Sequence, residues 1–185
     1  MIIHDCPLSG LKTIQMTKFE DNRGFLSEIF NAKHFRDGGL PIEFAQDNHT
    51  RSKPGTLRGL HFQRTPAQGK LVMVLRGKIQ DVAVDIRPKS PSYGQHHAIE
   101  LSDNNSKAFW IPFGFAHGFC VLGDEDADVL YKVTSSYNPD TQGGIRYDDP
   151  QLNIKWGIDN PIVSPRDADL PSWQDYGAHP LEGMQ

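Results

Sequence analysis

Hydrophobic residues in this chain gather in short runs that are separated by turn-forming residues. Segment 71–75 (LVMVL) is apolar at every position, a pattern that predicts a strand buried on both faces. Segment 80–86 (QDVAVDI) alternates, as a strand with two different faces does. The Arg-Gly-Lys sequence at 76–78 suits a tight turn, so the two segments together predict a β-hairpin.

Six further segments have the length and spacing of strands. They lie at residues 25–30, 42–48, 97–101, 108–111, 118–122 and 128–134. Before the C-terminal region, only segment 32–36 has a helical pattern, with Asn31 as its N-cap and Gly38 just past its end. The long helical crossovers of an α/β sheet are missing, which favours an all-β sandwich or closed barrel in a single domain over residues 1–185.

The composition narrows the classes of partner. Lys and Arg total 19 against 23 Asp and Glu, a net charge of -4, so we expect no general binding of nucleic acid or of anionic membranes. No apolar stretch approaches the ~20 residues that span a bilayer, and residues 1–10 lack a signal-peptide pattern, so the chain is predicted to be cytoplasmic. Cys6 and Cys120 are too few for a disulfide framework and are predicted to be reduced thiols, with Cys120 in the core.

Two spaced motifs lie at the centre of the chain. The first resembles the first motif of the cupin superfamily, and its residues are Gly55, His61, Gln63, Lys70 and Gly77. Segment 112–117 (PFGFAH) matches the second cupin motif, Pro-x-Gly-x-x-His. This resemblance implies a cupin-type jelly-roll β-barrel in which both motifs point side chains into one cavity. A few short helices, mainly near the C-terminus, complete the predicted fold.

The same positions argue against a metal centre. Metal-binding cupins carry His, His, Glu and His at the positions that are here His61, Gln63, Lys70 and His117. The lysine is cationic at neutral pH and would repel a divalent metal, so we expect no metal. A lone histidine is most often a hydrogen-bonded structural residue. The two motif matches favour a functional role for His61 and leave His117 as either a ligand contact or a wall residue.

Seven segments extend the resemblance to one enzyme family. They are 21–30 (DNRGFLSEIF), 46–48 (QDN), 57–63 (LRGLHFQ), 68–72 (QGKLV), 81–87 (DVAVDIR), 110–119 (WIPFGFAHGF) and 148–150 (DDP). In this order they resemble the signature blocks of the dTDP-4-dehydrorhamnose 3,5-epimerase family. The resemblance implies an isomerase that epimerises dTDP-4-keto-6-deoxy-D-glucose at C3 and C5 through an enolate, in dTDP-L-rhamnose biosynthesis. The C4 ketone acidifies both hydrogens, so a base, an electrophile and an acid suffice without a redox cofactor.

The resemblance assigns catalytic roles to four residues. His61 matches the general base. An imidazole suits this role because it can accept a proton near neutral pH. Asp167, which alone would look like a surface turn residue, matches the carboxylate that orients His61 and favours its protonated form. Lys70 is placed to stabilise negative charge on the C4 oxygen. Tyr131, which alone would be interpreted as a core or wall residue, matches the acid.

Further matches concern the binding of the nucleotide and the sugar. Guanidinium forks suit phosphate oxygens, and the arginines at matching positions are Arg23, Arg58 and Arg166. Polar contacts are matched by Glu28, Gln46, Asp47 and Asn48. Tyr137 matches the aromatic residue on which thymine stacks, and Phe19 and Phe25 either line the same pocket or belong to the core. Gln142 stands where the family commonly has Glu, so it keeps the hydrogen bonding of that residue without its charge.

The resemblance also implies a homodimer in which an N-terminal segment reaches the neighbouring subunit. Other functions stay open on the sequence alone. A related dTDP-sugar enzyme could epimerise one centre only, or move the carbonyl along the ring. A non-catalytic carbohydrate-binding cupin would have no reason to keep His61, Asp167, Lys70 and Tyr131 together, and a metal-dependent dioxygenase would need the ligands that are replaced here.

Overall fold

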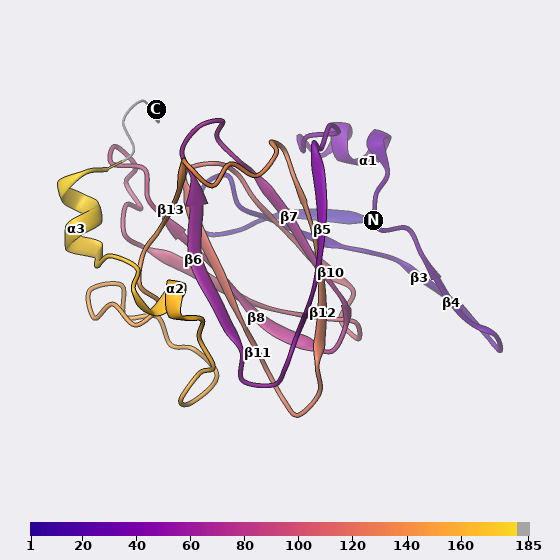
Figure 1. Ribbon diagram of the computed structural model, residues 1–185. Coiled ribbons are helices and arrows are strands. Elements are labelled where there is room, and N and C mark those ends of the chain that lie inside the picture. The colour runs from indigo at the N-terminus through magenta and orange to yellow at the C-terminus, as the bar shows by residue number, and fades with distance from the viewer. Residues whose placement is uncertain (181–185) are drawn as a thin grey trace.

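Two antiparallel sheets face each other in the computed structural model, which describes residues 1–180 (Figure 1). The six-stranded sheet has the order β1 (Ile2–Asp5), β2 (Lys12–Gln15), β10 (Lys107–Ile111), β7 (Lys70–Arg76), β12 (Ala127–Val133) and β5 (Gln46–Ser52). The five-stranded sheet has the order β13 (Gln142–Gly144), β6 (Leu57–Gln63), β11 (Phe115–Val121), β8 (Lys78–Asp85) and β9 (His96–Ser102). The prediction of an all-β, cupin-type barrel is confirmed.

Short helices complete the fold of the described residues. α1 (Ala32–Asp37) follows Asn31, whose side-chain oxygen accepts hydrogen bonds from the N–H groups of Lys33 and His34, and Gly38 caps its end. The predicted helix and both of its ends are therefore confirmed. α2 (Pro165–Ala168) and α3 (Trp173–Ala178) lie near the C-terminus, as predicted.

The predicted hairpin of segments 71–75 and 80–86 is wrong. Both segments are strands, but β7 pairs with β10 and β12 in one sheet while β8 pairs with β11 and β9 in the other. The chain crosses between the sheets at Gly77, where φ is +78° and an added Cβ would lie 2.7 Å from the carbonyl oxygen of Asp126. Alternation along a strand reports its two faces and not its partner, so the pattern could not separate a hairpin from this crossing.

The other predicted strands exist, some with shifted bounds. Segments 97–101, 108–111 and 128–134 agree closely with β9, β10 and β12, and segment 118–122 is the end of the longer β11. Segment 25–30 is a strand only in β4 (Gly24–Ser27), which pairs with β3 (Lys18–Asp21). Segment 42–48 becomes a strand only from Gln46, because Ile42 and Phe44 first pack on the outer face of the six-stranded sheet. β1, β2, β3, β6 and β13 fall outside the predicted strands.

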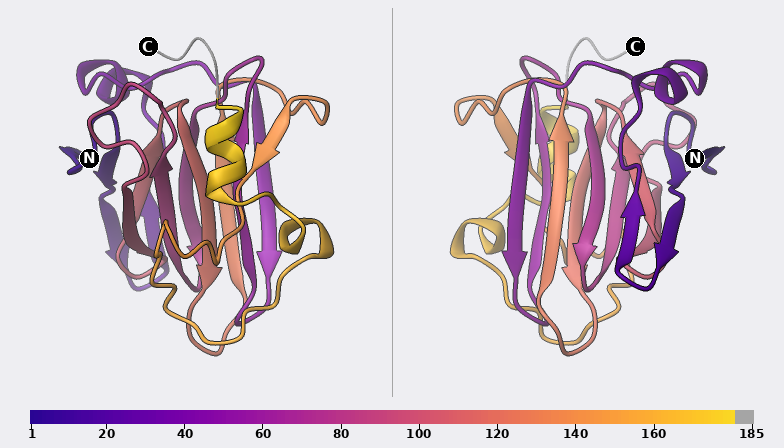
Figure 2. Two further views of the ribbon diagram at one scale, coloured as in Figure 1. Left: turned by 90° about the vertical axis from the view of Figure 1, so that its left-hand side faces the viewer. Right: turned by 90° about the vertical axis from the view of Figure 1, so that its right-hand side faces the viewer.

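Hydrophobic clusters cover both faces of each sheet. One cluster lies between the sheets and includes Phe109. A second covers the outer face of the five-stranded sheet, where α3 lies (Figure 2), and includes Val84 of β8 and Tyr176 of α3. The third covers the outer face of the six-stranded sheet, where Leu71 of β7 packs with Phe35 of α1. Segment 71–75 is thus buried on both faces as far as Val74, as predicted, but its last residue, Leu75, is 46% exposed.

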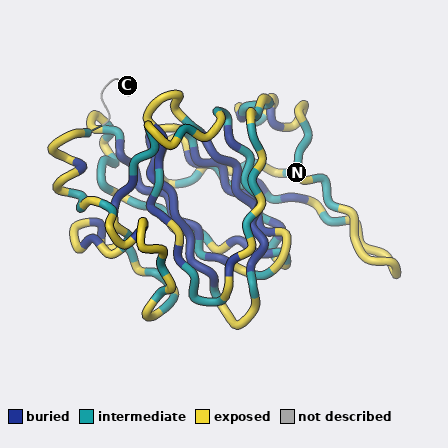
Figure 3. The backbone as a smooth tube through the Cα atoms, in the orientation of Figure 1, coloured by how far each residue is buried: buried dark blue, intermediate teal, exposed yellow. Residues whose placement is uncertain are grey.

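β3 and β4 form a separate two-stranded arm that extends away from the barrel (Figures 1 and 3). Phe19, Phe25 and Leu26 on this arm are 62%, 61% and 67% exposed. In the register of the arm, Phe19 lies opposite Leu26, and Phe25 lies on the other face. Exposed large apolar side chains on both faces mark a surface for interaction rather than a part of the core.

Both cysteines are free thiols, and Cys120 is fully buried, as predicted. No helix within residues 1–180 is long and apolar enough to cross a membrane.

Candidate active site

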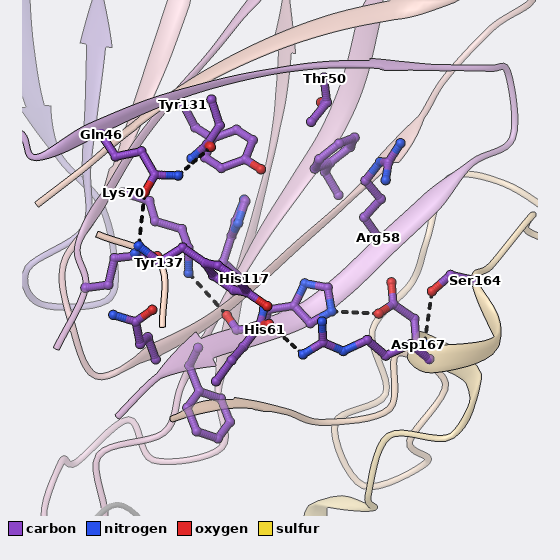
Figure 4. Close-up of a pocket in the computed structure, with 17 residues that line it drawn as sticks. Gln46, Thr50, Arg58, His61, Lys70, His117, Tyr131, Tyr137, Ser164 and Asp167 are labelled. Carbon is purple, nitrogen blue, oxygen red and sulfur yellow. Dashed lines mark hydrogen bonds and ion pairs between the residues drawn. The ribbon is translucent and has the colours of Figure 1, made fainter. Parts of the chain in front are cut away.

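A cavity of about 420 Å³ opens between the two sheets. Its walls come from β5, β6, β7, β11, β12 and β13, from the loop after β12 and from α2 (Figure 4). The structure brings together most of the residues predicted for the site. Those that line the cavity are Gln46, Asn48, Arg58, His61, Lys70, His117, Tyr131, Tyr137, Gln142, Arg166 and Asp167.

His61 and Asp167 form a hydrogen-bonded pair on one side of the cavity. His61 lies on β6, and its Nε2 is 2.7 Å from Oδ1 of Asp167. Asp167 is 5% exposed and lies in α2, where the N-cap Ser164 accepts a hydrogen bond from its N–H at 3.1 Å. When the imidazole is neutral and donates its Nε2 proton to the carboxylate, the lone pair lies on Nδ1. Nδ1 is therefore the nitrogen that can accept a proton from a substrate.

Gly59 holds the same carboxylate from a second direction. Its N–H donates a hydrogen bond to Oδ2 of Asp167 at 3.1 Å. With φ at +105°, an added Cβ would lie 2.6 Å from the His117 carbonyl oxygen and 2.8 Å from Cα of Gly118. β6 and β11 therefore approach at a point where only glycine fits, and this approach places His61 opposite His117 in the sheet register.

The pKa of the Asp167 carboxyl lies below its ordinary value. Burial alone would raise this pKa, but the hydrogen bond and charge of His61, together with the Gly59 N–H and Arg166, lower it by more. Asp167 is therefore a carboxylate throughout the neutral pH range, which is the state that can orient an imidazole and stabilise its cation.

Lys70 begins β7 and points into the cavity with its ammonium group largely buried. It is 8% exposed, and its Nζ donates a hydrogen bond to the carbonyl oxygen of His61 at 3.3 Å. Burial lowers the pKa of this ammonium to about 8, although the carboxylate of Asp81 acts in the opposite direction. Lys70 is thus mostly cationic at pH 7, and it places a poorly hydrated positive charge beside the strand that carries His61.

Tyr131 enters the cavity from the facing sheet. It lies on β12, opposite Asn48 of β5 and Val72 of β7, whereas His61 belongs to the five-stranded sheet. Figure 4 shows the two rings on different sides of the cavity. Burial raises the pKa of the Tyr131 hydroxyl, with Arg58 acting in the opposite direction, so the phenol keeps its proton at neutral pH. A planar group held between the rings would meet a base on one face and a proton donor on the other.

A second histidine–carboxylate pair lies further inside the barrel. Nε2 of His117 on β11 is 2.5 Å from Oδ1 of Asp81 on β8, and Asp81 is fully buried. Sequence reasoning placed Asp81 on a strand face and left it out of the site. A carboxylate between apolar residues of a strand was the available signal, because such a group is buried only with a partner. His117 lines the cavity, and its contact with a ligand stays a prediction.

Two pairs of polar side chains in the cavity are hydrogen-bonded. Gln46 and Asn48 project from the same face of β5, and Nε2 of Gln46 donates to Oδ1 of Asn48 at 2.7 Å. Nη2 of Arg166 donates to Oε1 of Gln142 at 2.6 Å. Because Gln142 is neutral, this bond fixes the guanidinium and leaves its positive charge free to meet an anion. Tyr137 lies beside this group and is 48% exposed.

The predicted binding residues near the arm lie outside this cavity. Arg23 is near the arm tip and pairs with Asp21, with 2.6 Å between Nη2 and Oδ2. Phe25 is on β4, and Phe19 is on β3. Glu28 follows the arm and accepts a hydrogen bond from Asn31 at 2.9 Å. Within one chain, the structure does not bring these residues to the catalytic group.

Asp47 also lies apart from the cavity. It alternates with Gln46 and Asn48 along β5, so its side chain points to the opposite face of the sheet. Its carboxylate pairs with Lys132 at 2.7 Å and is 55% exposed. The contact between Asp47 and a substrate stays a prediction.

Sequence reasoning left several cavity residues out of the site. They are Thr50, Phe62, Gln63, Gln68, Phe119 and Ser164. The two-residue period of a strand would have found Thr50, which follows Gln46 and Asn48 on the same face of β5. Gln63 belongs to the first cupin motif and Gln68 to segment 68–72, but neither residue was assigned to the site from the sequence.

The chemical groups of the cavity suit one type of reaction. A histidine held by a carboxylate can remove a proton from carbon beside a carbonyl, a buried ammonium can stabilise the enolate, and a phenol on the other side can return a proton. The barrel and this set of groups together define an isomerase of the cupin type. The family model described as dTDP-4-dehydrorhamnose 3,5-epimerase matches residues 5–175. The chain belongs to this family.

Known relatives agree with this assignment. The dTDP-4-dehydrorhamnose 3,5-epimerase of Methanothermobacter thermautotrophicus is 45% identical over 177 residues, which cover 94% of each chain. The crystal structure of dTDP-6-deoxy-D-glucose-3,5-epimerase from Legionella pneumophila, in complex with dTDP-4-keto-L-rhamnose, has a TM-score of 0.94 and 44% identity. It covers 100% of this chain and 98% of the other. A more distant relative from Streptomyces niveus, a dTDP-4-dehydrorhamnose 3-epimerase, is 36% identical over 178 residues, or 94% of this chain and 86% of that protein.

Proposed function

We propose that this chain epimerises dTDP-4-keto-6-deoxy-D-glucose at C3 and C5 and thereby acts in dTDP-L-rhamnose biosynthesis. The observation that carries the proposal is the position of the His61–Asp167 pair opposite Tyr131, with the ammonium of Lys70 beside His61. A cytoplasmic location, expected from the sequence, stays a prediction.

The reaction follows from these positions. Nδ1 of His61 takes the proton from C3 or C5, and the electron pair of the broken C–H bond moves into the enolate of the C4 ketone. Lys70 stabilises the oxygen of this enolate, and Asp167 stabilises the imidazolium. The hydroxyl of Tyr131 then protonates the carbon from the opposite face, which inverts it. Transfer of a proton from His61 to Tyr131 through solvent restores both groups for the second centre.

Several polar groups of the cavity suit the nucleotide. The guanidinium groups of Arg58 and Arg166 would meet the diphosphate, and their charge compensates the anion locally in a chain of net charge -4. Arg58 is held by a hydrogen bond from its Nε to Oγ of Ser52 at 3.0 Å, which leaves its terminal nitrogens for phosphate oxygens. Tyr137 is half-exposed, lies on the other side of His61 from Arg58 (Figure 4), and would stack on thymine.

The activity is tested by incubating the protein with dTDP-4-keto-6-deoxy-D-glucose in deuterated water and locating deuterium by NMR. We expect deuterium at both C3 and C5, each with inverted configuration. Deuterium at one centre alone would indicate a single-centre epimerase, and a carbonyl moved from C4 would indicate a ketoisomerase. A folded protein that exchanges neither hydrogen would contradict every one of these enzymatic functions.

We expect Asp167→Asn to keep the fold and to slow proton abstraction by about tenfold or more. An amide can still accept a hydrogen bond, but it cannot stabilise the imidazolium that forms when His61 takes the proton. The initial rate of C3 and C5 exchange with deuterated solvent measures this step. Asp169→Asn, at the exposed end of α2, is the matched control. An unchanged rate in Asp167→Asn would show that some other group supports His61.

We expect turnover to fall as the pH rises through about 8, because the Lys70 ammonium, whose pKa burial lowers to about 8, then loses the proton that makes it cationic. Below this pH the charge is present and stabilises the enolate. Lys70→Met has a similar length without the charge. This variant should be slower at pH 7, with kcat affected more than KM, and it should lack the alkaline fall near pH 8. A wild-type profile that is flat between pH 7 and 9.5 would contradict the role of Lys70.

We also propose that the chain acts as a homodimer in which the β3–β4 arm of one subunit completes the cavity of the other. The support is the exposure of Phe19 and Phe25, the position of Arg23 outside its own cavity lining, and the extension of the β3–β4 arm away from the barrel (Figure 1). A mixture of two inactive variants tests this. His61→Ala retains an intact arm, and an Arg23→Ala/Phe25→Ala variant retains an intact cavity. Refolding them together should restore about a quarter of wild-type activity, the share of sites that combine a good arm with a good cavity. No recovery would place the arm outside the site.

A further inference from the structure

Residues 134–141 form the loop that carries Tyr137 along the open end of the barrel. The loop leaves β12 in the six-stranded sheet and enters β13 in the five-stranded sheet. None of these residues is buried. Packing therefore contributes little to its conformation, and hydrogen bonds must hold it.

The side chain of Gln63 supplies hydrogen bonds to the peptide groups on both sides of Tyr137. Its Nε2 donates to the carbonyl oxygen of Ser136 at 3.1 Å, and its Oε1 accepts from the N–H of Asn138 at 2.8 Å. Nε2 also donates to the carbonyl oxygen of Pro66 at 2.8 Å, which ties the loop to the neighbouring turn. Gln63 is 4% exposed, so these bonds are shielded from water.

A second glutamine reaches the residue between these two groups. Oε1 of Gln46 accepts a hydrogen bond from the N–H of Tyr137 at 3.0 Å. Gln46 is partly exposed on β5, whereas Gln63 is buried on β6. The backbone of the loop is thus fixed from both sheets, with Gln63 as its most buried anchor.

We propose that Gln63 is a positioning residue that sets the nucleobase end of the binding site by fixing Tyr137. This inference rests on the proposed function, since it takes Tyr137 as the stacking surface for a pyrimidine nucleoside diphosphate. Gln63 occupies the cupin position at which metal-binding relatives of the fold carry a second histidine. Here its amide serves both as a donor to two carbonyl groups and as an acceptor of a backbone N–H. Carboxylate and thioether side chains cannot fill both roles.

Fixing the loop before the ligand arrives reduces the entropy lost on binding. Loss of Gln63 should therefore weaken the binding of ligands that carry a base and leave the diphosphate contacts unchanged. It should also leave the catalytic step nearly unchanged at saturating substrate. A merely structural role for Gln63 would instead weaken every ligand and lower kcat together.

Titration calorimetry with dTDP and with inorganic pyrophosphate separates these outcomes. For Gln63→Met we expect the Kd for dTDP to rise roughly tenfold, the factor that corresponds to about one well-buried hydrogen bond, and the Kd for pyrophosphate to stay within about twofold. KM for the sugar nucleotide should rise similarly, with kcat within about threefold. Gln80→Met is the matched control, because Gln80 bonds Lys155 and Gly157 in the same manner outside the cavity. It should leave both Kd values at wild-type levels.

A double-mutant cycle with Tyr137→Ala tests whether Gln63 acts through this ring. In the Tyr137→Ala background, Gln63→Met should weaken dTDP by less than about twofold. Gln63→Glu keeps the hydrogen-bond acceptor and removes the donors, so it replaces Gln63→Met in this test if Gln63→Met does not fold. We again expect weaker binding of dTDP and unchanged binding of pyrophosphate. Equal weakening of dTDP and pyrophosphate, an undiminished effect without Tyr137, or no effect at all would overturn the inference. A wild-type protein that fails to bind dTDP would instead overturn the proposed function itself.

Discussion

His61→Ala should lower the rate at which the C3 and C5 hydrogens exchange with solvent by a factor of about 10² to 10⁴. This factor is the usual contribution of a positioned base. Nδ1 of His61 is the only nitrogen of this pair left for the substrate, since Nε2 is bonded to Asp167. Alanine removes the base and leaves Lys70 and Tyr131 in place. The substrate ketone would still be polarised, but no group would remain to take the proton from C3 or C5. The rate of deuterium incorporation, followed by NMR under single-turnover conditions, measures the loss.

The control for this variant is His4→Ala, which removes an exposed histidine of β1 outside the cavity lining. It should exchange at the wild-type rate. If the His61→Ala protein binds dTDP normally and still exchanges both hydrogens, the base is a group other than His61. The buried His117–Asp81 pair would be the first candidate.

Tyr131→Phe should separate exchange from inversion. The enolate can still form, because His61 and Lys70 are untouched, and His61 can return a solvent-derived deuteron to the face from which it took the proton. Deuterium should therefore enter with the starting configuration, while inverted product falls by about 10² or more. The stereochemistry of the deuterated carbons, assigned by NMR coupling constants, distinguishes the two outcomes.

Tyr93→Phe is the matched control, because Tyr93 packs against Trp173 outside the barrel. It should invert both centres normally. If Tyr131→Phe inverts C3 and C5 at the wild-type rate, Tyr131 is a wall residue and water or another side chain is the acid.

Local pattern predicted much of this fold but not the pairing of its strands. The apolar run at 71–75 and the alternation at 80–86 correctly indicated two strands, and Gly77 correctly marked a change of direction. The same pattern fits a hairpin and a crossing between facing sheets, because the partner of a strand is fixed by residues far along the chain. Capping was more reliable, since Asn31 contacts only the first turn of its own helix.

The catalytic residues also divide into those that local motifs predicted and those that they did not. Motif spacing placed His61, Lys70 and His117 in one cavity because their strands are close in the barrel. Asp167 is 106 residues beyond His61, and only the family resemblance connected the two. The resemblance also named Arg23 and Glu28 without saying from which copy of the chain they come. Sequence spacing carries no information on that question, and within one chain both lie outside the cavity.

The C-terminal segment both covers the barrel and completes the active site. Tyr176 of α3 packs on the outer face of the five-stranded sheet, and its hydroxyl donates a hydrogen bond to the carbonyl oxygen of Ile86 at 2.7 Å. Earlier in the same segment, Asp167 reaches His61. Because local opening of a segment costs less than melting a whole barrel, mild heating would release this cover first. The enzyme would then lose activity while its strands remain paired. At that temperature the sample should keep the circular dichroism signal of its β-sheets and be catalytically inactive.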